Sequence, residues 1–288
     1  EIDEDQLVTL LTALATAGLI TKDGNSYANT EPASAFLVPG KPYYFGDYLR
    51  YQIDRQMFPV MLHLTDAIRG KYDRKKFADY EALMSDPKEA ELFSDSQHYG
   101  SLGPAKSLLR KVDLSSAKTF LDVGGGSGAF AIVMAQKHPE MTAKIIDFPN
   151  VEDTANHYIE EAGLSDRITF IPGNALETDW PGGQDAILMS YLFCGVGGSH
   201  FDWLAETAYD RLNPGGLVII HDFMVEDDRS GPYLAALWQL QHMVFTPSHV
   251  SLTPAMLEEL LKEKGFEIEL SDELIPGMTK VVVGRKPA

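Results

Sequence analysis

A glycine-rich turn between an apolar run and a helical segment constrains this chain more than any other feature. It reads Asp122-Val-Gly-Gly-Gly-Ser-Gly128, follows a buried-strand pattern at residues 119–123 and precedes a helix predicted for residues 128–138. Glycines allow a sharp backbone turn and a close approach to a ligand, and open α/β sheets bind ligands at the carboxyl ends of their strands. The turn therefore predicts a ligand site at the first strand of a parallel sheet.

The glycines alone leave the ligand undecided. They match G-x-G-x-G at Gly124, Gly126 and Gly128, with Ala129 they also meet the looser dinucleotide fingerprint, and a purely structural turn is a third interpretation. Asp122 precedes the first glycine by two residues, where a carboxylate would repel a pyrophosphate but would suit the ammonium of a methionine moiety. S-adenosylmethionine carries that ammonium and a sulfonium and lacks phosphate, so the carboxylate favours it.

Strands alternate with helices from residue 118 onward. The strands are expected at residues 119–123, 142–147, 168–171, 186–190 and 217–221, with helices at 128–138, 151–163 and 201–212. This order predicts right-handed βαβ units and an α/β fold whose parallel sheet is covered on both faces. Two final strands, at 266–270 and 279–284, are joined by a loop alone and predict an antiparallel edge.

The first part of the chain, up to about residue 112, has a helical pattern instead. An amphipathic helix is predicted for residues 7–17, the turn Lys22-Asp-Gly-Asn25 separates two short strands, and a long aromatic helix follows at residues 43–68, with a kink expected at Pro59. Helix, turn and hairpin together indicate a winged-helix-like module. The aromatic positions are typical of a core, although they could also wall a pocket.

Charge and composition narrow the class of partner. The 288 residues include 24 Lys and Arg against 42 Asp and Glu, a net charge of −18, which argues against nucleic acid as a partner and favours packing or dimerisation for the winged-helix-like module. Apolar stretches such as residues 129–135 fall far short of the roughly 20 residues of a membrane span. The single cysteine, Cys194, fits a reducing cytoplasm.

Residues that follow the next strands extend the predicted cofactor site. Asp147 ends a strand, where its carboxylate can accept hydrogen bonds from both ribose hydroxyls of either cofactor. Phe148 is a candidate to lie on the adenine, although a core position is nearly as consistent with the pattern. Asn174, after the third strand, offers an amide to the adenine edge, and we assign the adjacent Ala175 to the same site.

The ordered motifs resemble the S-adenosylmethionine-dependent O-methyltransferase family, which includes plant caffeate-type, hydroxyindole and bacterial antibiotic-tailoring enzymes. They are Asp122-Val-Gly-Gly-Gly-Ser-Gly128, Ile146-Asp-Phe-Pro149, Gly173-Asn174, Asn213-Pro-Gly-Gly216 and His221-Asp-Phe-Met224. The resemblance implies a homodimer with a winged-helix-like dimerisation domain at residues 1–100 and a Rossmann-like catalytic domain at residues 101–288. It also implies that Ser101 touches the methionine end of the cofactor, that Ser190 faces the cofactor, and that a first helix precedes Glu1.

The resemblance is incomplete at the general base. The family has a histidine just after the fourth strand, typically twenty residues before the Pro-Gly turn; Cys194 stands twenty residues before Pro214 and His200 only fourteen. The intervening helix cannot lose six residues without losing more than a turn and a half, so we place Cys194 at the base position. A thiol is a poor base, with an ordinary pKa of about 8.5. His200 stays a secondary candidate if the loop rearranges.

Another histidine is the first choice for a role in the pocket. His242 lies on the helix predicted for residues 233–244, where the resemblance implies a substrate-contacting residue, although a surface or core-edge position is equally open. A metal site built from His221, Asp222 and either His242 or His249 is conceivable, but the spacing shows no compact ligand motif. We therefore predict no metal, and expect Asp222 to cap and orient its neighbours.

These observations predict a cytoplasmic, homodimeric methyltransferase that acts on a small molecule. Oxygen is the acceptor that the resemblance implies, but a thioether needs no base, so the cysteine makes a compound such as 4-methylthio-2-hydroxybutyrate, in dimethylsulfoniopropionate synthesis, a serious candidate. Three further functions stay open: carbon methylation of a 2-oxo acid, an NAD-linked oxidoreductase, and a protein that binds S-adenosylmethionine without transferring methyl groups.

Overall fold

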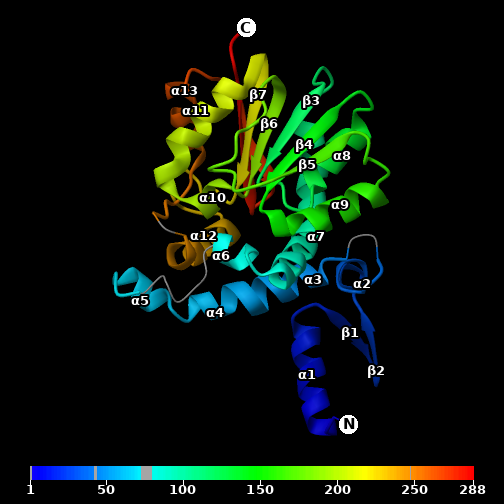
Figure 1. Cartoon of the computed structure of the whole chain (residues 1–288). Helices are drawn as coiled ribbons and strands as arrows, with labels where there is room; N and C mark the ends of the chain where they lie inside the picture. Colours follow the sequence, from blue (N-terminus) through cyan, green and yellow to red (C-terminus); the bar gives the residue numbers. More distant parts are fainter. Residues whose placement is uncertain (1, 42–43, 73–79, 247) are drawn as a thin grey trace.

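A computed structural model describes residues 2–41, 44–72, 80–246 and 248–288. A central sheet with helices on both faces forms the main body, a band of helices lies beneath it, and an N-terminal helix and hairpin project away from the body (Figure 1). The chain therefore has the predicted α/β architecture together with a separate N-terminal region.

The main sheet has seven strands in the order β5-β4-β3-β6-β7-β9-β8. The strands are β3 Thr119–Val123, β4 Thr142–Asp147, β5 Ile168–Pro172, β6 Gln184–Ser190, β7 Leu212–Asp222, β8 Glu267–Ile275 and β9 Thr279–Arg285. The first five are parallel, and β9 runs antiparallel to β7 and β8, which confirms the predicted antiparallel edge. The strand order reverses between β3 and β6, and ligands of open α/β sheets bind at such a point.

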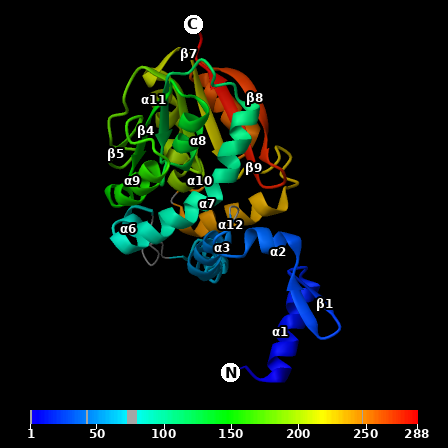
Figure 2. The same cartoon turned by 90° about the vertical axis from the view of Figure 1, so that its right-hand side faces the viewer.

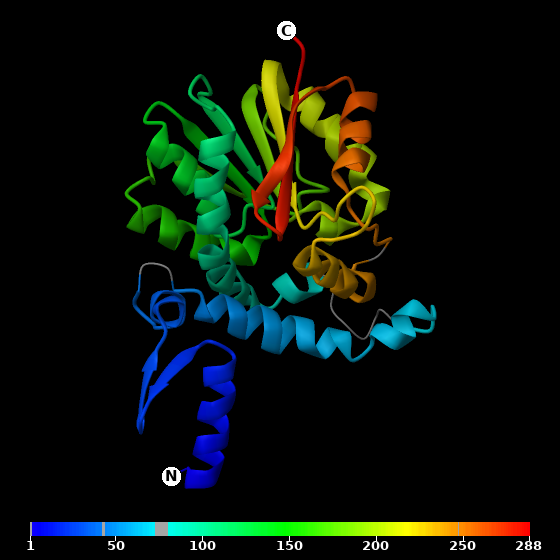
Figure 3. The ribbon, with the colours of Figure 1, turned by 180° about the vertical axis from the view of Figure 1, so that it is seen from behind.

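Both faces of the sheet are buried, as a parallel sheet requires. Phe120 packs with helices α7 Pro87–Lys111, α8 Ala129–Lys137 and α9 Glu152–Glu161, whereas its neighbour Leu121 packs with α11 Phe201–Arg211 and α13 Pro254–Glu263 on the opposite face. Consecutive strand residues point to opposite faces, so one apolar run supplies two cores. Seen from behind, α7 crosses one face of the sheet (Figure 3).

Helix α7 agrees with the helical pattern expected up to about residue 112, although no separate helix is predicted there. Its backbone is helical over 25 residues and continues through Gly100, Gly103 and Pro104. Ala105 and Leu108 are fully buried within it, and this packing outweighs the low helix propensity of glycine and proline. The predicted domain boundary between residues 100 and 101 falls inside this helix.

The prediction of one aromatic helix at residues 43–68 is wrong in its detail. The segment consists of α3 Gly46–Leu49, the π-helix η1 Arg50–Met57, α4 Phe58–Met61 and, after a turn, α5 Leu64–Ile68, and Tyr43 lies outside the described residues. Pro59 sits in the first turn of α4, where a proline is tolerated. Further short elements are α6 Tyr80–Met84, η3 Pro149–Val151, α10 Phe193–Val196 and η4 Gly198–His200, and α12 Tyr233–Phe245 is confirmed.

The N-terminal region contains α1 Glu4–Thr16, the hairpin of β1 Ile20–Asp23 with β2 Ser26–Asn29, and α2 Glu31–Phe36. A side view shows α1 and the hairpin standing clear of the body (Figure 2). No residue of α1 is buried, although its sequence is amphipathic. No helix among the described residues combines the length and the apolar character of a membrane span.

Candidate active site

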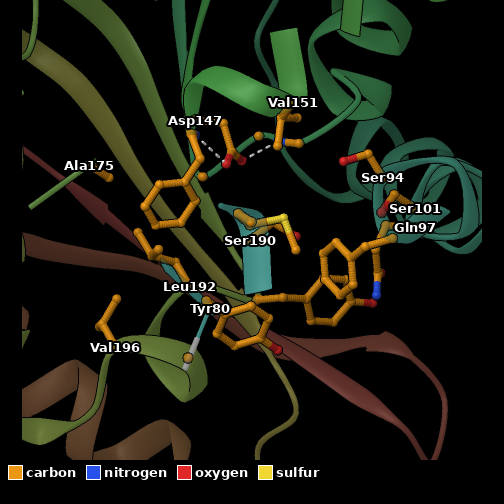
Figure 4. Close-up of a pocket in the computed structure, with 18 of the residues that line it drawn as sticks. Tyr80, Ser94, Gln97, Ser101, Asp147, Val151, Ala175, Ser190, Leu192 and Val196 are labelled. Carbon is orange, nitrogen blue, oxygen red and sulfur yellow. Dashed lines mark hydrogen bonds between the residues drawn. The ribbon is translucent and has the colours of Figure 1, made fainter. Parts of the chain in front are cut away.

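One cavity lies at the carboxyl ends of β3, β4 and β6, where the strand order reverses (Figure 4). Its first half comes from the sheet: the glycine turn, the end of β4, and the loops after β5 and β6. Its second half comes from helical segments distant in sequence: α3, η1, α6, α7 and α12. We call these halves the cofactor edge and the acceptor wall.

The glycine turn brings the backbone to the cavity. Gly124 and Gly126 have φ angles of 68° and 55°, in the left-handed region that side chains rarely adopt, and both line the cavity. A Cβ at Gly128 would lie 2.6 Å from Cδ1 of Ile145, so this glycine permits close packing of α8 on the sheet. Gly128 does not itself line the cavity, which limits its predicted role in cofactor binding to shaping the turn.

Asp122 is a buried acid without a partner. Its side chain lines the cavity, and neither carboxylate oxygen has a hydrogen-bond partner within the described chain. Burial raises the pKa of Asp122 to about 7; the nearby backbone amide of Ala131 opposes this rise without reaching a hydrogen bond of good geometry, and the carboxylate of Asp147 adds to it. A buried carboxylate is costly unless it is paired, so this group fits the cationic part of a ligand.

Asp147 holds the glycine turn in place. Its Oδ2 accepts a hydrogen bond of 2.7 Å from the amide of Gly126, and its Oδ1 accepts one of 2.7 Å from the amide of Phe148. Each carboxylate oxygen can accept a further bond, so both stay available to ribose hydroxyls. Burial raises the pKa of Asp147 to about 6. Phe148 lines the cavity and also packs against the core, so both interpretations of this residue have a structural basis.

The remaining predicted cofactor residues all line the cavity. Asn174 uses its Oδ1 to accept a bond of 3.0 Å from the amide of Leu176, so its side chain shapes the turn beside Ala175. Ser190 Oγ lies 2.8 Å from His221 Nδ1. Ser101 comes from α7, on the same side of the cavity as Gln97 (Figure 4).

Cys194 lies at the start of α10, buried and against the cavity. Its amide donates to Asp222 Oδ2 at 3.0 Å, and Asp222 Oδ1 accepts from the amide of Phe223 at 2.8 Å. Asp222 thus caps this turn, as predicted. Burial raises the pKa of the Cys194 thiol well above its usual range, with the Asp222 carboxylate adding to the effect, so the thiol is not a base at neutral pH.

His242 is held in one tautomer by its neighbours. Its Nδ1 lies 2.8 Å from Thr246 Oγ1, and that hydroxyl donates its single hydrogen to the Cys194 carbonyl at 2.9 Å. The hydroxyl can therefore only accept from the imidazole, so Nδ1 carries the hydrogen and Nε2 keeps a free lone pair. Nε2 has no hydrogen-bond partner within the described chain, and His242 lines the cavity. Burial lowers the pKa of His242 to about 3, which keeps the ring neutral.

The other predicted catalytic candidate, His200, does not lie in the cavity. It ends η4 and precedes α11, and it is not among the cavity-lining residues. The helix that separates it from β7 keeps almost its predicted length, so His200 cannot move into the base position. Within residues 2–41, 44–72, 80–246 and 248–288, no three His, Cys, Asp or Glu side chains come together as a metal site.

The structure adds several residues that the sequence did not single out. Tyr48, Tyr80 and Trp238 line the acceptor wall, and Tyr48 comes from the aromatic segment that could have walled a pocket. His98 Nδ1 lies 2.9 Å from Ser127 Oγ in the glycine turn, and its ring stacks on Tyr158 at 3.6 Å. No local motif marks these residues, because their roles depend on contacts between distant segments.

The fold and the cavity define a Rossmann-like methyltransferase that uses S-adenosylmethionine: an unpartnered carboxylate at the reversal of strand order suits a cofactor that is cationic and lacks phosphate. The chain belongs to the O-methyltransferase family, since the O-methyltransferase domain pattern matches residues 62–267. A 3-hydroxy-5-methyl-1-naphthoate 3-O-methyltransferase from Streptomyces sahachiroi is 33% identical over 279 residues, covering 96% of this chain and 80% of that enzyme.

Two further comparisons complete the family assignment. An L-tyrosine C(3)-methyltransferase from Streptomyces lavendulae is 31% identical over 203 residues, covering 69% of this chain and 55% of that enzyme. The crystal structure of human N-acetylserotonin methyltransferase in complex with S-adenosylmethionine has the same fold, with a TM-score of 0.85 and 24% identity over 98% of this chain and 83% of that chain. The chain is therefore a methyltransferase enzyme, which decides against the NAD-linked oxidoreductase.

Proposed function

We propose that this enzyme methylates a hydroxyl group on a small aromatic molecule and that His242 takes up the hydroxyl proton. The observation that carries the proposal is the free lone pair of His242 Nε2, which is buried, unpartnered within the described chain and located in a wall of the cavity. A base at His242 would replace the histidine that the resemblance implies at the position of Cys194.

The acceptor wall supports an aromatic acceptor. Phe223 stacks on Trp238 with ring centroids 4.5 Å apart and planes 17° apart, and Tyr48 lies 6.3 Å from Trp238 with planes 13° apart. All three rings line the cavity. These rings stack on one another and give this part of the cavity an aromatic, apolar lining, against which an aromatic ligand can pack. The name of the Streptomyces sahachiroi relative gives a hydroxyl group on a naphthalene ring as its acceptor, which agrees with an aromatic hydroxyl; the carboxylate of that compound has no Lys or Arg to pair with among the described lining residues here.

The proton explains why a base is needed. S-adenosylmethionine supplies an electrophilic methyl group on a positively charged sulfur, and as the new O–CH3 bond forms the old S–CH3 bond breaks and the hydroxyl proton is released. His242 accepts that proton at Nε2, so the positive charge of the site is conserved. Burial lowers the pKa of His242 to about 3 in the free enzyme, so the ring is neutral and its Nε2 lone pair is free. The same burial makes the ring a weak base, so we couple its protonation to the loss of the sulfonium charge as the methyl group leaves. A base in such a position contributes roughly 10²–10⁴-fold to the rate.

The direct test is incubation with methyl-labelled S-adenosylmethionine and a panel of aromatic hydroxyl, thioether and 2-oxo acid compounds, read by mass spectrometry. We expect label on the oxygen of at least one aromatic hydroxyl compound and no product from a matched methyl ether. Labelling confined to thioethers or to carbon would contradict the proposal.

Thioether methylation is the second candidate, because the buried thiol of Cys194 provides no base where the family has one. A thioether would need none. The described residues that line the cavity include no Lys or Arg to pair with the carboxylate of 4-methylthio-2-hydroxybutyrate or of a 2-oxo acid. We therefore favour an aromatic hydroxyl compound over these two acceptors. His242→Ala distinguishes the two: it removes oxygen methylation and leaves thioether methylation unchanged.

We also propose that the enzyme is a cytoplasmic homodimer, with residues 1–100 supplying the dimer contacts and residues 101–288 the catalytic domain. Leu7, Val8 and Leu10 of α1 are 37%, 48% and 50% exposed, and a second copy would cover such a face. The single free cysteine supports a reducing compartment. Light scattering after gel filtration should give twice the mass of 31.8 kDa, and Leu10→Glu should reduce it to that of one chain.

A further inference from the structure

Two polar side chains on the acceptor wall have no partner. Gln52 and Ser94 are each 1% exposed and both line the cavity. Gln52 Nε2 and Ser94 Oγ make no hydrogen bond within the described chain. Buried polar groups in folded proteins are nearly always hydrogen-bonded, so two such groups at one cavity wall indicate a ligand that pairs with them.

The two side chains come from elements that pack on each other. Tyr51, next to Gln52, meets Phe93, next to Ser94, edge to face with ring centroids 5.7 Å apart. The Tyr51 hydroxyl also donates to Oε2 of Glu89 at 3.0 Å, which ties η1 to α7. Gln52 and Ser94 therefore belong to two elements that are in contact, and both side chains line the cavity.

The backbone around Gln52 is itself unusual. Gln52 belongs to the π-helix η1, and π-helical turns are rare and occur frequently at functional sites. Tyr48, one turn earlier, lines the cavity with Gln52, whereas the next residue, Ile53, is 38% exposed. On the opposite element, Ser94 shares its side of α7 with Gln97 and Ser101, and all three side chains lie at the cavity (Figure 4).

We propose that Gln52 and Ser94 form a subsite that binds a neutral oxygen of the acceptor, such as the carbonyl of an aromatic ketone or quinone. This inference rests on the proposed aromatic hydroxyl acceptor and names a second group that the acceptor carries. The Gln52 amide and the Ser94 hydroxyl both donate hydrogen bonds, whereas His242 Nε2 accepts one, so the cavity is complementary to a molecule with a hydroxyl and a separate carbonyl.

The charge around the subsite favours an uncharged oxygen over a carboxylate. Glu81 lines the same cavity, and the described lining residues include no Lys or Arg. A carboxylate placed here would meet a negative neighbour and no described cation. The carbonyl oxygen accepts the same hydrogen bonds without this penalty.

The test compares three probes of one size: 6-hydroxy-2-acetonaphthone, 6-ethyl-2-naphthol and 6-hydroxy-2-naphthoate. Their affinities are measured by calorimetry on the full chain loaded with S-adenosylhomocysteine, so the result does not depend on turnover. We expect the ketone to bind about 5- to 10-fold more tightly than the ethyl compound, the range of one net hydrogen bond, and the carboxylate to bind more weakly than the ketone.

Variants test whether the preference for the ketone over the ethyl probe arises from Gln52 and Ser94. Gln52→Leu should abolish the ratio between ketone and ethyl probes, and Ser94→Ala should reduce it, while the affinity for S-adenosylhomocysteine and the melting temperature report that each variant is folded. Asp54→Asn is the control on η1: Asp54 lies two residues further along, is exposed and does not line the cavity, so the ratio should stay at its wild-type value. Ser96→Ala is the corresponding control on α7, since Ser96 Oγ is bonded to the Phe93 carbonyl.

Several results would overturn the subsite. These are equal binding of the ketone and ethyl probes by the wild type, no ketone binding at millimolar concentration, a preference for the carboxylate, and a ketone preference that survives Gln52→Leu. Failure of the proposed function would give a different result. The ketone would bind with the expected dependence on Gln52, but its hydroxyl would not be methylated by labelled S-adenosylmethionine.

Discussion

The cofactor edge and the acceptor wall of the same cavity are built in different ways. On the cofactor edge, Asp122, the glycine turn and Asp147 occupy 26 residues of chain, and the bond from Gly126 to Asp147 joins two adjacent strand ends. On the acceptor wall, Tyr48 and His242 stand almost 200 residues apart. The cofactor edge is thus a local product of two neighbouring strands, whereas the acceptor wall exists only after helices from both ends of the chain have packed.

This difference indicates how the two functions are distributed. The cofactor is the same as in the solved relatives that hold S-adenosylmethionine or its product, and a compact motif at a strand end is sufficient for that task. Acceptors vary, and the wall that meets them comes from segments that can change independently. We therefore expect substitutions on the cofactor edge to alter cofactor affinity, and substitutions on the acceptor wall to alter turnover and acceptor choice.

The largest effect is expected from His242→Ala on the acceptor wall. Loss of the base should lower kcat for a hydroxyl acceptor by about 10²–10⁴-fold, because Nε2 no longer takes the proton. The affinity for S-adenosylhomocysteine, measured by calorimetry, should change little. Since the pKa of His242 is about 3, wild-type kcat should show no titration of this ring between pH 5 and pH 9. An equal loss of cofactor affinity would break the distinction between the two halves.

On the cofactor edge, Asp122→Asn should weaken S-adenosylmethionine binding by about 10²-fold, since the carboxylate that faces the cation is lost. The wild-type affinity should fall as the pH drops below about 7, because the free enzyme then protonates Asp122 and the cofactor must displace that proton. The variant should lose this dependence. Calorimetry from pH 6 to pH 8 measures both, and Asp210→Asn, at an exposed position, serves as the control.

The same substitution should stabilise the enzyme without ligand. A carboxyl group whose folded pKa is raised binds more protons in the folded state, so its ionisation destabilises the fold as the pH rises from the unfolded pKa of about 3.9 to the folded value. At pH 8, Asp122→Asn should therefore raise the free energy of unfolding by about 1–3 kcal/mol. Urea denaturation at pH 8 gives this value, and a decrease would show that the carboxylate has a stabilising partner.

A smaller effect is expected from Thr246→Val, which removes the hydroxyl that holds the tautomer of His242. We expect kcat to fall about 10-fold, because the ring can then place its hydrogen on Nε2. Thr246→Ser keeps the hydroxyl and should restore most of the activity. Unchanged KM for the acceptor together with this rescue separates the positioning of His242 from general damage to the fold, and full activity of Thr246→Val would contradict the assigned tautomer.

The smallest effect is expected from Cys194→Ala. The thiol stays protonated because its pKa is raised far above neutrality, so we expect kcat for a hydroxyl acceptor to change by less than about threefold. The turn itself depends on the amide of Cys194, which donates to Asp222 in either variant. Steady-state kinetics with the labelled cofactor measures the ratio, and a loss comparable to that of His242→Ala would return the catalytic role to Cys194.

Several features of the fold could be predicted because their cause is local. Alternation of strands and helices indicates a parallel sheet, and a carboxylate at a strand end must lie at the edge where ligands bind. By contrast, the helical pattern before residue 112 does not give the bounds of α7, because the fully buried Ala105 and Leu108 outweigh the helix-breaking tendency of Gly100, Gly103 and Pro104. The π-helical turn η1 also has no signature in the spacing of its residues.

By itself, the sequence determined the sheet, the cofactor edge and the class of cofactor, since strand periodicity and the glycine turn act over a few residues. Only the tertiary structure distinguishes the three catalytic candidates and supports the proposed role of His242. His200 lies outside the cavity, and the thiol of Cys194 is buried. Thr246 lies between His242 and the Cys194 carbonyl. The tautomer of the buried imidazole depends on a hydrogen bond between Thr246 and Cys194, which are 52 residues apart, and no local pattern encodes such a contact.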